Sequence, residues 1–196
     1  MNLPAAREFI LQRLLTGLDP RMIYHSYQHT LDVCHTAREL GVRESVSPGE
    51  METLETAALF HDTGLLDGYA DHEEKSAEYA AEHLPRFGFP EEEIRKIRKL
   101  IRCTRLPQEA ESRLDQILCD ADLYYLGQDE FFVNSFKLKL EWKLFGVRDY
   151  TLREWLELQQ KFLSSHRYFT ATARSEREQG KKRHLTEITE LLHHLQ

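Results

Sequence analysis

The adjacent residues His61 and Asp62 are the first candidates for chemistry in this sequence. They follow the small and apolar run AALF at residues 57–60, so both side chains are expected to project from a buried helix face. A buried polar group without a partner costs roughly 1–3 kcal/mol, and a buried carboxylate without a countercharge costs still more. A divalent cation is a common remedy, so the pair indicates a metal site.

Two further side chains of the same types lie on apolar helix faces elsewhere in the chain. His29 shares a face with Val33, and Asp122 lies four residues after Leu118. Together with the His-Asp pair they make two imidazoles and two carboxylates, a set that suits Mn, Fe, Co, Ni or Zn, and Mg less well. Such a set leaves positions open for water and a phosphate oxygen, as a hydrolytic metal site requires.

The elements that must position these residues are helices. Capping residues, apolar periodicity and Gly or Pro punctuation divide the chain into helical segments with little sign of strands. The expected segments are residues 4–18, 26–40, 47–64, 71–85, 90–103, 112–126, 131–145 and 151 onward, with one or two charged helices from Thr170. We therefore predict an all-α fold, a compact single domain of about eight to nine helices over residues 1–196. Residues 24–127 hold the core motifs, and the helices of 128–196 are expected to close the bundle.

Local signals set the expected ends of three of these helices. Ser47 and Glu50 have the spacing of a capping box, and Asp71 and Glu74 repeat it at the start of the fourth helix. Gly41 is expected to stop the second helix in a left-handed conformation. Five histidines that lack a comparable context are expected at the surface: His35, His83, His184, His193 and His194.

Composition narrows the class of partner. The net charge is −7, with 33 acidic against 26 basic residues. This balance disfavours a nucleic-acid polymer, which requires clustered Lys and Arg, whereas a bound metal and a few local cations still permit a small phosphorylated substrate. No apolar run is long enough to span a membrane. Three widely spaced cysteines form neither a disulfide framework nor a zinc-finger pattern, which favours a cytoplasmic location.

Four segments of the chain follow known sequence patterns. They are YHSYQHTLDV at 24–33, AALFHDTG at 57–64, DHEEKSAEYA at 71–80 and DADLYYLG at 120–127. These segments resemble the YHxxxH, ALLHDxG, HxxxGA and DADxLxxLG segments of the HD superfamily of metal-dependent phosphohydrolases. The resemblance implies hydrolysis of a small phosphoester, with a nucleotide or cyclic nucleotide as the first expectation, by attack of metal-bound hydroxide. It also implies that the divalent metal ion is bound by His29, His61, Asp62 and Asp122.

The resemblance assigns further roles around this metal. His25 matches the first His of YHxxxH and is expected to protonate the leaving group, with a backbone-bonding helix-start residue as the alternative. Residues 25 and 29 lie one turn apart and can face the same pocket. Asp62 is expected to orient the attacking water as well. His72 matches a second-metal ligand or substrate contact, and Lys75 is expected to meet a phosphate unless it is a solvated helix-face lysine.

The chain also departs from the two-metal members of that superfamily. Where they carry a His-His pair after the fifth helix, this sequence reads IRCTRLP at 101–107, which argues against a full second metal. Weaker candidates for contact with phosphate are Arg102, Arg105 and Arg167. The alternatives to a hydrolase are a non-catalytic HD module that senses metal and nucleotide, and a di-iron HD oxygenase. A homodimer is left open.

Overall fold

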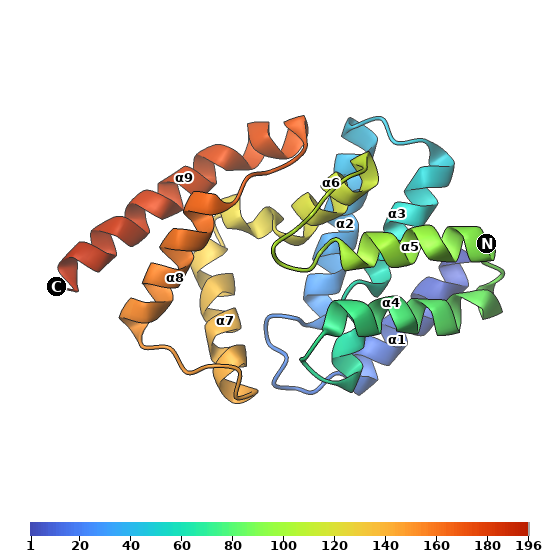
Figure 1. Cartoon of the computed structure of the whole chain (residues 1–196), viewed down its shortest axis with the longest axis horizontal. Helices are drawn as coiled ribbons and strands as arrows, with labels where there is room; N and C mark the ends of the chain where they lie inside the picture. The colour runs from blue at the N-terminus through green and yellow to red at the C-terminus, as the bar shows by residue number, and fades with distance from the viewer. Residues whose placement is uncertain (196) are drawn as a thin grey trace.

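The computed structural model describes residues 1–195, which form nine α-helices and three short 3₁₀ helices without a strand (Figure 1). The predicted all-α fold is therefore confirmed. The α-helices are α1 (Leu3–Gly17), α2 (Tyr27–Arg43), α3 (Pro48–Phe60), α4 (His72–His83), α5 (Glu91–Arg102), α6 (Arg113–Asp122), α7 (Phe131–Leu144), α8 (Leu152–Ser165) and α9 (Ala171–His194). The 3₁₀ helices are η1 (Thr63–Asp67), η2 (Leu84–Phe87) and η3 (Tyr124–Gly127). Among the helices of residues 1–195, none has the length and apolar composition needed to cross a bilayer.

The helices form two groups that meet at α2, α6 and η3. Helix α2 packs against α3 and α6, and α5 packs against α3 and α4. The remaining helices α7, α8 and α9 lie on the opposite side in Figure 1, where α9 packs against α8 and η3. We call α1–α6 the N-terminal half and α7–α9 the C-terminal half.

The core of the N-terminal half fixes α3, the helix that leads to His61. Leu54 and Ala58 of α3 and Ile97 and Ile101 of α5 are fully buried against each other's helices. Burial of a side chain of the size of leucine or isoleucine stabilises the fold by about 1.5–3 kcal/mol. The first turn of α3 has the predicted capping box of Ser47 with residue 50. Helix α3 is therefore fixed along its length by packing and at its start by the capping box, and this fixes the position of its C-terminal end, where His61 follows.

The expected stop of α2 at Gly41 is wrong, because this glycine serves packing. Helix α2 continues to Arg43, and a Cβ atom at Gly41 would lie 2.6 Å from Cε of Met51 on α3. The absent side chain lets the two helices approach closely. Ser45, with φ of 57°, adopts the left-handed conformation just after the helix instead.

The start of α4 also differs from its prediction. Asp71 makes no side-chain capping hydrogen bond and adopts a left-handed conformation with φ of 52°. Its carboxylate pairs with Arg105 at 3.0 Å, while Glu74 accepts two hydrogen bonds of 2.6 Å from Arg102. Both acids therefore face the neighbouring segment around α5, and tertiary ion pairs replace the expected capping box.

Helix α3 ends at Phe60, before the expected stop at Gly64. Gly64 lies inside η1, where a Cβ atom would lie 2.2 Å from the carbonyl oxygen of His72. No other residue fits this contact without a shift of the backbone. The glycine thus lets the first turn of α4 rest directly on η1, which brings His72 toward Asp62.

The prediction of surface histidines holds for His35, His193 and His194, which are exposed, and is wrong for the other two. His184 is 2% exposed, lies with Nδ1 3.0 Å from the Leu126 carbonyl oxygen and stacks on Phe131. His83 is 9% exposed and stacks on Tyr79 with ring centroids 4.0 Å apart. Aromatic stacking makes these rings part of the packed interior.

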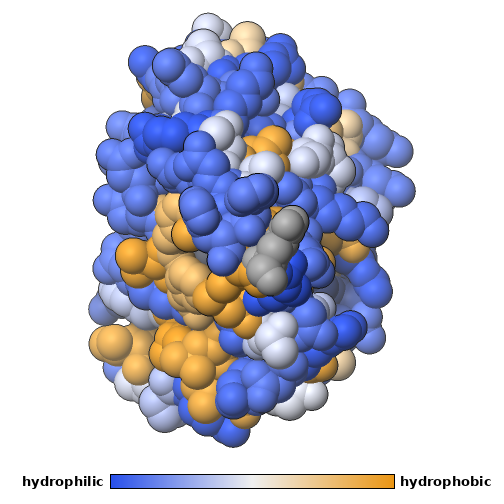
Figure 2. All heavy atoms as spheres, turned by 90° about the vertical axis from the view of Figure 1, so that its left-hand side faces the viewer, coloured by the Kyte–Doolittle hydropathy of each residue, from blue (hydrophilic) through white to orange (hydrophobic). Residues whose placement is uncertain are grey.

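One face of the C-terminal half is partly apolar. Figure 2 shows apolar side chains gathered on the side of the molecule that carries α8 and α9. Exposed large apolar residues of α7 to α9 and the loop between α7 and α8 are Val133, Phe136, Leu140, Leu144, Val147, Leu152, Leu191 and Leu195.

Candidate metal centre

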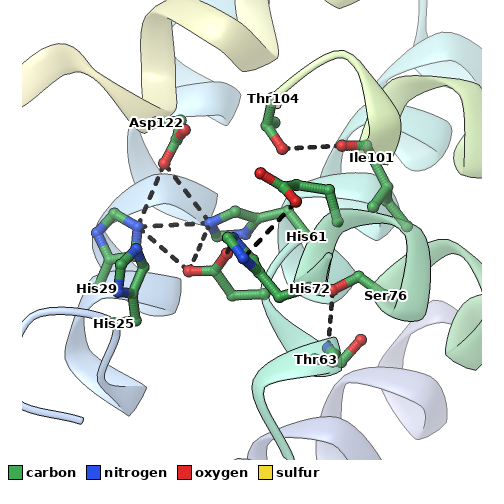
Figure 3. Close-up of polar contacts among 12 residues, drawn as sticks. His25, His29, His61, Thr63, His72, Ser76, Ile101, Thr104 and Asp122 are labelled. Carbon is green, nitrogen blue, oxygen red and sulfur yellow. Dashed lines mark hydrogen bonds and ion pairs between the residues drawn. The ribbon is translucent and has the colours of Figure 1, made fainter. Parts of the chain in front are cut away.

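Three of the four predicted ligands form a tight cluster between α2, α3 and α6 (Figure 3). Nε2 of His29 lies 3.4 Å from Nε2 of His61 and 3.3 Å from Oδ1 of Asp122. Ligand atoms about 2.0–2.2 Å from a shared ion lie roughly 3.0–3.5 Å apart, so these separations fit a common ion. The three side chains come from the start of α2, the end of α3 and the end of α6, which meet at this point.

Asp62 lies beside this cluster with a carboxylate oxygen that lacks a partner. Its Oδ2 is 3.2 Å from Nε2 of His61 and 3.5 Å from Nε2 of His29, yet it is buried and makes no hydrogen bond. An unsatisfied buried carboxylate oxygen is costly and rare, and a cation between it and the two rings would satisfy it. The residues present therefore fit a metal ion, with Asp62 as the fourth candidate ligand.

The orientation of His61 is set by the backbone of its own helix. Its Nδ1 lies 2.7 Å from the carbonyl oxygen of Ala58, so Nδ1–H donates there and Nε2 turns its lone pair to the cluster. Burial opposes protonation of this ring, but Asp62 and Asp122 raise the pKa of His61 to about 9. The same charges that favour a proton here also favour a bound cation.

His72 reaches the other oxygen of Asp62. Its Nε2 is 3.7 Å from Oδ1 of Asp62, and its ring centroid is 5.7 Å from that of His25. The side chain is thus next to the cluster, on the side of the second carboxylate oxygen. Its role as a metal ligand or as a substrate contact stays a prediction.

His25 is held by Glu141, a residue of α7 that the sequence did not reveal. Oε1 of this fully buried carboxylate lies 2.5 Å from Nδ1 of His25 and accepts a hydrogen bond of 3.0 Å from the Tyr69 hydroxyl. Oε2 accepts from the backbone N–H groups of Tyr24 and His25, at 2.8 and 3.1 Å. With Nδ1–H directed to the carboxylate, Nε2 is the ring nitrogen left for a reaction partner.

The charges around this pair favour its ionised form. Burial opposes protonation of His25, but the hydrogen bond to Glu141 and the nearby carboxylates raise its pKa above the ordinary value. Burial likewise opposes ionisation of Glu141, but the bonds from His25 and the backbone lower its pKa. The one sequence signal for this residue is that Glu141 is the single acid of α7, between Leu140 and Trp142.

Two cavities flank the cluster. One of about 480 Å³ is lined at its polar end by His25, Asp62, His72 and Asp122, and extends between the two halves of the molecule. The other, of about 450 Å³, lies on the side of His29 and contains Lys137.

Lys75 is not among the residues that line either of these cavities, and its ammonium group donates to the Asp67 carbonyl oxygen at 3.4 Å. Its contact with phosphate stays a prediction. Arg105 lines the larger cavity, Arg102 is bound to Glu74, and Arg167 donates to the Ser164 carbonyl oxygen in a different part of the surface.

The sequence model of the HD domain matches residues 26–125, a span that includes all four candidate ligands. This chain belongs to the HD domain family. As an HD domain protein it resembles a predicted HD superfamily hydrolase from an uncultured Thermotogales bacterium, with a TM-score of 0.64 and 23% identity. That match covers 98% of this chain and 92% of the other.

A second solved structure with the same fold is Bacillus subtilis YpgQ in complex with ADP. Its TM-score is 0.64 at 19% identity, and the match covers 96% of this chain and 95% of YpgQ. Both likenesses extend over α7–α9, so the fold is shared beyond the segment that the family model matches. No curated protein matches the chain.

Proposed function

We propose that this HD domain protein hydrolyses a small phosphoester, with a nucleotide or cyclic nucleotide as the first candidate. The observation that carries the proposal is the cluster of His29, His61 and Asp122 beside the unpartnered oxygen of Asp62. The ADP bound by YpgQ, which shares the fold, supports a nucleotide as the substrate class.

The residues divide into those that hold the metal and those that act on the substrate. His29, His61, Asp62 and Asp122 would hold a divalent metal ion, which would lower the pKa of water and shield the charge of the phosphoryl group. Asp62 has a second carboxylate oxygen, which orients the attacking water by accepting its hydrogen bond. His25 donates the proton of Nε2 to the departing oxygen.

Glu141 supports this proton transfer from the opposite side of the His25 ring. Its carboxylate accepts the Nδ1–H bond, which keeps the ring in one orientation and stabilises the imidazolium that precedes the transfer. After the transfer the ring keeps its proton on Nδ1 and is neutral, so it takes up a proton from solvent at Nε2 before the next turnover. The arrangement is therefore that of a general acid with a buried carboxylate partner.

The test of the function is metal analysis followed by a substrate panel. Purified protein is expected to carry a transition metal, and His61→Ala or Asp62→Ala is expected to remove it while the circular dichroism of the helices persists. His35→Ala, an exposed histidine on the same helix as His29, is the matched control and should keep the metal. Equal metal content in the wild type and in both ligand variants would contradict the assignment.

The panel then separates hydrolysis from the two alternatives. Phosphomonoesters, nucleotides and cyclic nucleotides are offered with Mn, Co, Ni and Mg in turn, and turnover that depends on the metal supports the hydrolase. Binding of nucleotide without turnover under every metal would identify a sensor module. Two irons per chain with consumption of oxygen would identify an oxygenase.

A further inference from the structure

The larger cavity contains a buried amide that has no partner. Oε1 of Gln159, on α8, is buried and accepts no hydrogen bond, and the residue as a whole is 5% exposed. Leaving such a group unsatisfied costs about 1–3 kcal/mol, so a glutamine at this position is unfavourable for stability alone. Gln159 is among the residues that line the cavity, and the same cavity reaches the metal centre.

The walls around this amide are apolar and come mainly from the C-terminal half. Leu138 and Trp142 of α7 and Leu158 and Phe162 of α8 line the same end of the cavity. A cavity of about 480 Å³ lies in the size range of small-molecule sites, which combine apolar walls with a few polar groups that fix orientation. The lining therefore suits a flat, apolar ring system with hydrogen-bonding groups at its edge.

The charges along the cavity disfavour a second anionic group away from the metal centre. Asp71 and Glu73 line the cavity on either side of His72 in the chain, and the one Lys or Arg among the lining residues, Arg105, is already paired with Asp71 at 3.0 Å. A phosphate is favoured at the metal centre alone, and the remainder of the ligand must be neutral. A nucleobase has this property, and its edge carries donors and acceptors that an amide can pair with.

We propose that this cavity is the nucleobase subsite of the enzyme and that Gln159 is its specificity-determining residue. The proposal rests on the proposed function, because it assumes that the phosphate of the same ligand lies at the metal centre. The side-chain amide of Gln159 exchanges hydrogen bonds with the edge of the base, while Trp142 and Phe162 contact its faces or rim. The substrate class is accordingly a nucleotide, and not a sugar phosphate or a polyphosphate without a base.

The test compares ligands that share a phosphate and differ in the base. Binding of nucleoside 5′-monophosphates and of ribose 5-phosphate to the metal-loaded protein is measured by titration calorimetry, with tryptophan emission, to which Trp142 in the cavity wall contributes, as a second signal. Gln159→Leu is expected to weaken the nucleotides roughly 5- to 50-fold, the effect of losing one or two hydrogen bonds, and to leave ribose 5-phosphate unchanged. Gln160→Leu, the same change one residue along α8, is the control; Gln160 donates to Thr189 on α9.

A thermal measurement separates a ligand contact from a structural role. Replacing an unpartnered buried amide by an apolar side chain of similar size is expected to keep or raise the melting temperature, whereas loss of a structural residue lowers it. Should Gln159→Leu fail to fold, Leu158→Trp narrows the cavity without touching the amide, and it should weaken nucleotides while sparing ribose 5-phosphate.

The outcomes also distinguish this proposal from the hydrolase itself. A base-dependent loss of binding without turnover of any phosphoester supports the subsite and contradicts the proposed activity. Turnover of a nitrophenyl phosphate with equal affinity for nucleotides and ribose 5-phosphate overturns the subsite and leaves the activity standing. Equal losses for both ligands in Gln159→Leu would overturn it as well.

Discussion

Replacement of Glu141 by glutamine tests whether this buried carboxylate orients His25, the proposed general acid. Glutamine keeps the size of the side chain, and its carbonyl oxygen can take the place of Oε2, which accepts the backbone N–H groups of Tyr24 and His25. The amide nitrogen then replaces Oε1, which accepts from Nδ1 of His25 and from the Tyr69 hydroxyl. The substitution therefore keeps the hydrogen bonds to the backbone. It places a hydrogen-bond donor instead of an acceptor next to Nδ1 of His25.

The magnitude follows from these contacts. A hydrogen bond to a charged group contributes about 1.5–3 kcal/mol, and a protein of this size loses about 2–4 °C of melting temperature per kcal/mol. We expect Glu141→Gln to lower the melting temperature by about 3–12 °C on these grounds. In the variant the amide donates to Nδ1, so His25 keeps its proton on Nε2 and can no longer form a stabilised imidazolium. Loss of general-acid catalysis then lowers kcat by about 10²–10⁴-fold.

The assay measures kcat on a nitrophenyl ester and on an ester of a sugar alcohol, together with the metal content and the circular dichroism spectrum. The loss should be larger on the sugar ester, because an alkoxide needs the proton that a nitrophenolate does not. Glu157→Gln, on the exposed part of α8, is the control and should behave as the wild type. A variant that binds metal, folds and keeps kcat within about threefold on both esters would refute the reasoning, since a working general acid contributes far more.

Three further changes give separate tests. His25→Ala is expected to keep the metal and lower kcat by about 10²–10⁴-fold, and equal losses on both esters would show that His25 is not the proton donor. His72→Ala should lower the metal stoichiometry if His72 is a ligand, or raise KM at unchanged stoichiometry if it contacts substrate; no change in either quantity would exclude both roles. Burial and the charge of Lys181 lower the pKa of His166 from 6.5 to about 4. Protonation of His166 is less favourable in the folded state than in the unfolded state. The contribution of the neutral ring to the free energy of unfolding is therefore complete above pH 6.5 and is lost as the pH falls toward 4. His166→Gln should therefore reduce the loss of stability between about pH 7.5 and pH 4.5 by at most about 3 kcal/mol in urea unfolding, and an unchanged pH dependence would contradict it.

The sequence predicts best the features that are encoded locally. The start of α3 follows from the spacing of Ser47 and Glu50, and the order of His29, His61 and Asp122 lies within one family pattern. The capping box lies within four residues, and each of the three ligands lies within its own short motif, so these signals can be read without knowledge of the tertiary contacts.

Features that depend on distant contacts escape this kind of prediction. Gly41 looks like a helix stop, yet it is required by the proximity of Met51 on another helix. Glu141 lies 116 residues from His25, and nothing near it in the chain indicates the partner. The unpartnered oxygen of Gln159 is likewise a property of the assembled cavity, because only the fold decides which amides find a partner.

The separation of His25 and Glu141 along the chain has a consequence for synthesis of the protein. The ribosome adds the residues between Asp122 and Glu141 in about 1–4 s, and until α7 has emerged and docked, Nδ1 of His25 lacks its contact with Glu141. A nascent chain, or a fragment cut after Gly127, would contain every candidate metal ligand but lack the carboxylate that orients the acid. The proposed hydrolytic activity would therefore arise late in folding, after α7 has packed against the N-terminal half.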